Sequence, residues 1–342
     1  MRNLRSAAMT TLLLVATGAQ AAPPNYHVVK QVPLGLPDKW DFVHFDADTA
    51  RVYATHSSEI TVVDAKSGAV AGRIPNIAGA HDVAIVPALG RGYADNGHTG
   101  SVTVFDLSTL KTVGQIPADN DADAMLYDPE SGKLAVANGD AHSVSIIGPK
   151  AGTRLANVAL PGSPEMMAAN GAGKIYINIA SANEIVRLDL VTTKIDASWK
   201  IPACESPHGL AMDRATRRLF VSCHNAKMLV VNAENGKVVA DLPIGNGTDS
   251  AAFDPERKLA FSANKDGTLS VIEEKSADSF VALGDVPTAP GARNMAEDPK
   301  TGRVYLVTAD VAGTLPPRKP GGDTQLQFAP GSVKLLILEP GK

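Results

Sequence analysis

The stretch Leu259–Glu273, LAFSANKDGTLSVIE, is the clearest signal of the fold, because two short strand-like runs flank a polar turn in it. The first run is small and apolar, and the second carries β-branched residues, which favour strands. Val52–Asp64, VYATHSSEITVVD, has the same layout near the start of the chain. Each stretch therefore predicts a β-hairpin, and the recurrence indicates that the hairpin belongs to a repeat.

Working outward from these hairpins, the 342-residue chain repeats a unit of four short strands. Successive units open with similar six-residue segments, 41 to 44 residues apart: Asp41–Asp46, Asp82–Pro87, Asp123–Asp128, Glu165–Asn170, His208–Asp213, Asp249–Asp254 and Arg293–Asp298. A unit of this size cannot bury its own faces, so neighbouring units must stack. We therefore predict an all-β, seven-bladed β-propeller of four-stranded blades. The 30 Gly and 23 Pro suit such a strand-and-turn protein.

The last blade is incomplete in chain order, because the sequence ends soon after the strand pattern of Val333–Leu338. Tyr26–Val32, YHVVKQV, has the pattern of a fourth strand and precedes the first blade. We expect this N-terminal strand to pair into the last blade, which closes the ring and hides an exposed sheet edge. Residues 309–330 interrupt the same blade, and their Pro- and Gly-rich middle predicts a long loop.

These repeats resemble the YVTN family of β-propellers, secreted or periplasmic proteins of the YncE-like type with WD40-like repeats. The resemblance covers the whole chain after the N-terminal segment. It rests on the hairpins quoted above and on Pro207-His208-Gly209, which opens the fifth blade. The resemblance implies the propeller fold, but related propellers include lactonases, lyases and pure binding scaffolds, so it assigns no chemistry.

The N-terminus reads as a secretory signal over residues 1–21, followed by one propeller domain over residues 22–342. Arg2 and Arg5 precede the apolar run Ala7–Ala16, and Ala19-Gln20-Ala21 matches a signal-peptidase site. We expect a periplasmic or secreted protein, the alternative being an apolar N-terminus on a cytosolic one. The run is too short to span a bilayer, and no other segment is long and apolar enough. A formal net charge of −4 disfavours nucleic acid as a partner.

In a propeller, the residue that opens the first strand of each blade lies nearest the central channel. Read from all seven blades, these ring residues are Asp41, Asp82, Asp123, Glu165, His208, Asp249 and Arg293. We predict that they converge on one channel mouth and form a ligand site. Five carboxylates so arranged repel one another unless a cation or a cationic ligand neutralises them. The alternative is that each carboxylate caps nearby backbone N–H groups.

A divalent metal ion is one candidate for that cation, with Asp82, Asp123, Glu165 and Asp249 as its ligands. Six of the eight histidines are expected on the same face as the ring. His81 and His208 have the best claim to a site and are the candidate general bases of an enzyme. The other four, which lie in the loops between second and third strands, are expected to be separate surface residues: His56, His98, His142 and His224.

Cys204 and Cys223 are the only cysteines. Both are expected near the same end of the fifth blade, and an oxidising compartment favours a disulfide between them. A metal site of these two cysteines with His208 and His224 is the alternative.

The sequence therefore leaves two functions open and does not decide whether the protein is an enzyme. The first is a non-catalytic, monomeric propeller that binds a protein, a peptide or a small ligand on its channel face. The second is a metal-assisted hydrolase or lyase of the lactonase type, in which a bound cation polarises a carbonyl group. The chain has no GxSxG, Walker, HExxH or CxxC motif.

Overall fold

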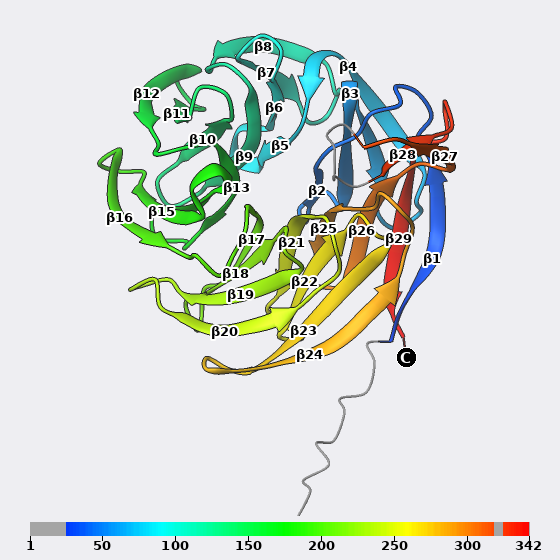
Figure 1. Cartoon of the computed structure of the whole chain (residues 1–342). Helices are drawn as coiled ribbons and strands as arrows, with labels where there is room; N and C mark the ends of the chain where they lie inside the picture. Colours follow the sequence, from blue (N-terminus) through cyan, green and yellow to red (C-terminus); the bar gives the residue numbers. More distant parts are fainter. Residues whose placement is uncertain (1–24, 318–323, 342) are drawn as a thin grey trace, which may run out of the picture.

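The computed structural model describes residues 25–317 and 324–341, and within them the strands form seven antiparallel blades around one axis (Figure 1). The first strand of each blade lies innermost and the fourth lies at the rim. The predicted seven-bladed propeller is therefore confirmed. The signal peptide predicted over residues 1–21 lies outside the described residues.

The first three blades follow one another along the chain. Their strands are β2 (Val43–Asp46), β3 (Arg51–Asp64) and β4 (Val70–Ala80); β5 (Val83–Val86), β6 (Arg91–Asn96), β7 (Ser101–Asp106) and β8 (Thr112–Pro117); β9 (Ala122–Asp128), β10 (Lys133–Asn138), β11 (Ser143–Gly148) and β12 (Thr153–Ala159). The long β3 covers both the second and the third predicted strand of its blade, and Ser57, with φ 57°, lies between them. A short 3₁₀ turn, η1 (Pro87–Leu89), follows β5.

The next three blades repeat the same up-and-down order. Their strands are β13 (Pro164–Ala169), β14 (Lys174–Ile179), β15 (Glu184–Asp189) and β16 (Lys194–Lys200); β17 (Pro207–Asp213), β18 (Arg218–Cys223), β19 (Lys227–Asn232) and β20 (Val238–Pro243); β21 (Thr248–Asp254), β22 (Leu259–Asn264), β23 (Thr268–Ser276) and β24 (Ser279–Pro287). A second 3₁₀ turn, η2 (Ala180–Ala182), follows β14.

The seventh blade closes the ring with both ends of the chain. Its sheet has the order β1-β29-β26-β25, formed by β25 (Asn294–Asp298), β26 (Arg303–Thr308), β29 (Lys334–Pro340) and β1 (Tyr26–Pro33). The register of β1 against β29 runs from Tyr26 opposite Pro340 to Pro33 opposite Lys334. The predicted closure by the N-terminal strand is therefore confirmed.

The insertion in the seventh blade contains structure that the sequence analysis missed. Its two ends form a separate hairpin of β27 (Val311–Leu315) and β28 (Gln325–Phe328), so the prediction of a loop throughout was wrong for these residues. Phe328 packs edge-on against Trp40, with 4.8 Å between the ring centroids. This contact ties the hairpin to the segment that leads into the first blade.

Large aromatic side chains separate neighbouring blades. The third residue of the second strand is aromatic and fully buried in six blades: Tyr53, Tyr93, Tyr176, Phe220, Phe261 and Tyr305. Each belongs to a different hydrophobic cluster. Repeating a large side chain at one position gives each blade a similar spacing, because buried aromatic rings contribute the most contact area.

β-Bulges turn several ring residues toward the axis. The register between first and second strands breaks at Asp123, Glu165, His208 and Asp249. A bulge leaves a residue without a ladder partner and re-aims its side chain, often beside a functional site. Asp41, Asp82 and Arg293 instead lie just before their first strands. Both arrangements free the ring residues from regular strand pairing.

Candidate functional site

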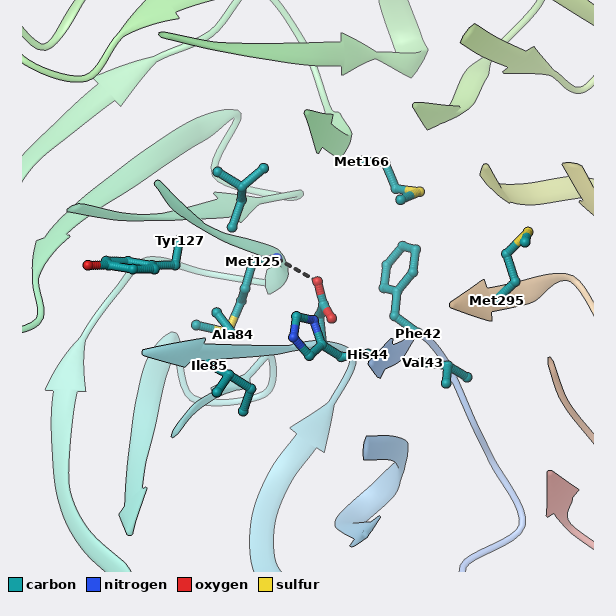
Figure 2. Close-up of a pocket in the computed structure, with 11 residues that line it drawn as sticks. Phe42, Val43, His44, Ala84, Ile85, Met125, Tyr127, Met166 and Met295 are labelled. Atoms are coloured by element: carbon teal, nitrogen blue, oxygen red, sulfur yellow. Dashed lines mark hydrogen bonds between the residues drawn. The ribbon is translucent and has the colours of Figure 1, made fainter. Parts of the chain in front are cut away.

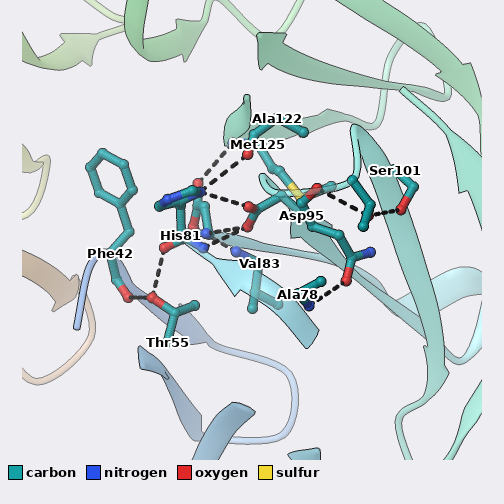
Figure 3. Close-up of polar contacts among 12 residues, drawn as sticks. Phe42, Thr55, Ala78, His81, Val83, Asp95, Ser101, Ala122 and Met125 are labelled. Atoms are coloured by element: carbon teal, nitrogen blue, oxygen red, sulfur yellow. Dashed lines mark hydrogen bonds and ion pairs between the residues drawn. The ribbon is translucent and has the colours of Figure 1, made fainter. Parts of the chain in front are cut away.

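His81 lies beside the ring on the second blade, and a buried carboxylate fixes its position (Figure 3). The His81 Nδ1 atom is 2.9 Å from Oδ2 of Asp95, a side chain that has no solvent exposure. The backbone N–H groups of His81 and Asp82 both donate to Oδ1 of Asp95, at 2.8 and 2.6 Å. A Cβ atom on Gly97 would lie 2.4 Å from the His81 ring, so this position requires glycine. Asp95 therefore orients the imidazole.

Asp82 is a structural residue in this network. Its Oδ1 atom accepts a hydrogen bond from the backbone N–H of Val83, and Oδ2 accepts one from that of Met125 on the third blade. The carboxylate thus joins two blades, as the capping alternative predicts. Because both oxygens are engaged, Asp82 is a weaker candidate for a ligand than the other acidic ring residues.

Asp41, Asp249 and Arg293 are linked through Asn294 and an ion pair. The Asn294 side chain donates to Oδ1 of Asp41 at 3.2 Å and to Oδ2 of Asp249 at 2.9 Å. The Nε atom of Arg293 lies 3.3 Å from the same Asp249 oxygen. Arg293 therefore neutralises part of the acidic ring, while Asn294 links carboxylates from the first and sixth blades.

Asp123 has a buried oxygen that nothing satisfies. Within the part of the chain that the structure describes, Oδ1 of Asp123 is buried and has no hydrogen-bond partner. Native proteins rarely leave a buried polar atom in this state, since it loses its hydration without compensation. An unsatisfied carboxylate oxygen beside other carboxylates is suited to accept a donor from a bound ligand.

Burial and mutual repulsion raise the pKa of four of the acidic ring residues. Burial, opposed by two backbone hydrogen bonds, raises the pKa of Asp82 to about 8. Burial together with the charges of Asp123 and Asp249 raises the pKa of Glu165 to about 9. Burial is also the main cause that raises the pKa of Asp123 to about 7, and it places the pKa of Asp41 well above its usual range. A cation bound at the channel mouth would displace the protons from these carboxyl groups.

His81 carries a positive charge at neutral pH. Burial disfavours its charged form, but the hydrogen bond and charge of Asp95, together with Asp123 and Asp41, outweigh that effect and raise the pKa to about 10. These same interactions show that groups from the first three blades lie close enough to influence one another. A protonated imidazole donates hydrogen bonds but cannot accept a proton.

His208 and His224 form the part of the mouth on the fifth blade. Their rings stack with 3.7 Å between centroids and 16° between planes. The Nε2 atom of His208 lies 3.5 Å from Oε1 of Glu165, and its Nδ1 atom is 2.9 Å from the Ser206 carbonyl oxygen. A disulfide joins Cys204 to Cys223, the residue before His224. The cysteines are therefore not available for the alternative metal site that included them.

The prediction of four surface histidines was wrong for one of them. His56 is fully buried, with its ring nitrogens near Pro37 O at 3.2 Å and Thr61 Oγ1 at 2.6 Å. His224 is exposed but stacks on His208, because the turn after β18 lies beside the bulge of β17. His98 and His142 are exposed, as expected.

A cavity of about 280 Å³ lies among the first strands (Figure 2). Its lining is mostly apolar and includes Phe42, Met125, Met166 and Met295, while Asp82 belongs to both the cavity and the ring. Methionine side chains adapt to irregular ligand shapes because they are flexible and polarisable. The channel therefore offers an apolar space next to the acidic ring residues.

Sequence reasoning missed Asp95 and Asn294 at this site. The fifth residue of the second strand is Thr55, Asp95, Ala137, Asn178, Ser222, Ala263 or Val307 in the seven blades. Asp95 is the only charged residue at that position, and this difference was the available signal. Asn294 follows Arg293 directly and had no comparable signal.

Comparison with solved structures supports the fold. A chain from the crystal structure of the mitotic checkpoint complex matches with a TM-score of 0.72 and 12% sequence identity, covering 100% of this chain and 99% of that chain. At that identity the likeness shows the propeller fold alone. No protein-family model and no curated protein matches the sequence. Among the described residues, no helix has the length and apolar character needed to cross a membrane.

Proposed function

We propose that this chain is a non-catalytic propeller of the YncE-like kind, periplasmic or secreted, whose channel mouth binds a positively charged group of its ligand. The buried, unpartnered oxygen of Asp123 within the acidic ring carries this proposal. Asp123 and Asp249 lie close enough to Asp41 and Glu165 for their charges to raise the pKa of both. An ammonium or guanidinium group on a peptide or small molecule supplies both the charge and the hydrogen bonds that such a site lacks.

The adjoining cavity supports a ligand with an apolar stem. Phe42 and three methionines line the cavity. Asp82 also lines it and is one of the acidic ring residues. A lysine side chain or an alkylammonium ion combines a charged head with such a stem. Aromatic and methionine side chains contact both alkyl chains and cations favourably.

Binding of n-alkylammonium ions and of a lysine-containing peptide, measured by calorimetry, tests the proposal. We expect affinity to rise with alkyl length and to fall at least tenfold in Asp123→Asn. Asp140→Asn is the matched control, since Asp140 is exposed at the end of the hairpin on the same blade. The proposal fails if none of these probes binds, or if both variants lose the same affinity.

The His81–Asp95 pair favours a second candidate function, the metal-assisted hydrolase. A carboxylate that orients a histidine is a common arrangement for general-base catalysis. The pKa of about 10 for His81 argues against it, because a base must be unprotonated at the working pH. Lactone hydrolysis measured with and without a chelator separates the two functions. Chelator-sensitive turnover that is lost in His208→Ala and His81→Ala would replace the binding function with the enzyme.

A further inference from the structure

Three metal-ligating side chains come together between the fifth and sixth blades. His208 lies in the bulge of β17, His224 follows β18 directly, and Asp249 lies in the bulge of β21. One ligand atom from each lies within 4.8 Å of the other two. Among the described residues, these three form the only such group of His, Cys, Asp and Glu. The four carboxylates predicted as metal ligands do not form a group of this kind.

The hydrogen bonding of His208 prepares it for a metal ion. Its Nδ1–H donates to the carbonyl oxygen of Ser206 at 2.9 Å, which leaves Nε2 as the nitrogen with a free lone pair. Histidine ligands of metals typically donate their other N–H to a carbonyl or carboxylate in this way. The Nε2 atom faces Oε1 of Glu165 at 3.5 Å, so a second carboxylate lies at the edge of the group.

His224 is anchored through its backbone. Its N–H donates to the carbonyl oxygen of Glu205 at 2.8 Å, and the preceding Cys223 is bonded to Cys204. The ring stacks on that of His208 and is exposed, so it has room to turn when an ion binds.

Asp249 is oriented by two groups that contact the same oxygen. Asn294 donates to Oδ2 at 2.9 Å, and the Nε atom of Arg293 lies 3.3 Å from it. Neither contact involves Oδ1. The Arg293 side chain is 43% exposed, so it has room to move toward solvent when an ion takes its place beside Asp249.

We propose that His208, His224 and Asp249 bind a divalent transition-metal ion of the zinc class, with Glu165 as a fourth ligand. Two imidazoles and carboxylate oxygens suit Zn²⁺, Ni²⁺ or Cu²⁺, whereas Ca²⁺ and Mg²⁺ prefer all-oxygen sites. The site goes beyond the proposed binding of a cationic ligand, because it depends on nitrogen ligands that an ammonium group does not need.

Zinc titration of the chelator-treated, dialysed protein, followed by calorimetry, tests the site. We expect one Zn²⁺ per chain, and a loss of affinity of at least tenfold in both His224→Ala and Asp249→Asn. His98→Ala and His142→Ala are the matched controls, since both histidines are exposed and lie in equivalent loops of other blades. Excess Mg²⁺ should not displace the zinc.

Cobalt substitution gives a second readout that does not depend on affinity. Co²⁺ bound by two imidazoles should show visible absorption bands that His224→Ala removes and His142→Ala retains. The site is refuted if zinc binds below one half equivalent, or if a control variant weakens binding as much as His224→Ala does. Asp123→Asn separates the two proposals, because it should lose alkylammonium binding and keep zinc binding.

Discussion

The two halves of the channel mouth differ in how fully their polar groups are satisfied. On the second blade, Asp95 accepts three hydrogen bonds, and Asp82 uses both oxygens to join two blades. On the fifth and sixth blades, His208 uses one ring nitrogen for a hydrogen bond to Ser206 and stacks on His224, and Asp249 has contacts on one oxygen. Saturated groups hold the fold, whereas unsaturated ones remain free for a ligand. Residues of one chemical type at equivalent repeat positions therefore serve different purposes.

Removing Asp95 should have the largest effect on stability, because it breaks the hydrogen-bond network of the second blade. Asp95→Ala leaves the backbone N–H groups of His81 and Asp82 without an acceptor and removes the carboxylate partner of the His81 imidazole. Loss of one partner from a buried ion pair typically costs about 3–5 kcal/mol of unfolding free energy. Urea unfolding followed by circular dichroism measures this cost. A loss below about 1 kcal/mol would show that the network does not stabilise the fold.

The disulfide should stabilise the fifth blade, which lies in the less saturated half of the mouth. Cys204 and Cys223 are 19 residues apart, and closing a loop of that length stabilises a fold by about 3 kcal/mol in the chain-entropy model. The double variant Cys204→Ala/Cys223→Ala should lose about that much in urea unfolding. An unchanged unfolding midpoint would mean that packing alone stabilises the fifth blade.

Rising pH should destabilise the protein through the buried titratable groups of the channel mouth. Unfolded Asp82 and Glu165 titrate near pH 4, whereas their folded pKa values are about 8 and 9. Between these limits the folded chain binds more protons than the unfolded chain, so the free energy of unfolding falls as pH rises. The pKa of His81, about 10 against an ordinary 6.5, acts in the same direction: its stabilisation is complete below pH 6.5 and is lost as pH rises through 10.

We therefore expect the melting temperature to drop by on the order of 5 °C between pH 5 and pH 9, measured by calorimetry. Glu165→Gln should flatten this curve by removing one of the titrating groups. A melting temperature that rises over the same pH range would contradict the raised pKa values of these buried groups.

The smallest effect on stability is expected for the removal of the His224 side chain. His224 is exposed, and its side chain makes few contacts. His224→Ala should change the unfolding free energy by less than about 1 kcal/mol. His224→Ala and Asp95→Ala test the comparison together. A large loss of unfolding free energy in His224→Ala and a small loss in Asp95→Ala would contradict it.

The repeat predicted the architecture because propeller geometry depends on period and strand pattern. The segments that open each blade fixed the register, and the pattern of Tyr26–Val32 was enough to predict ring closure. The β27–β28 hairpin was missed, because the Pro- and Gly-rich centre of the insertion dominated its pattern. Local composition does not show how the ends of such a segment pair.

The site was predicted less completely, because its details depend on contacts between blades. The ring positions followed from register alone. The partnership of His81 with Asp95, the stack of His208 on His224, and the role of Asn294 required three-dimensional placement. The capping function of Asp82 also separates it from Asp123, although both residues occupy the same repeat position.

A carbon-13 NMR titration of the side-chain carboxyl groups of Asp123 and Glu165 measures the desolvation and crowding at the mouth. Protons retained by mutual repulsion and burial should give midpoints near pH 7 for Asp123 and near pH 9 for Glu165. Midpoints near pH 4 for both groups would show ordinary, well-hydrated carboxylates. The seven blades would then not form the binding site described above.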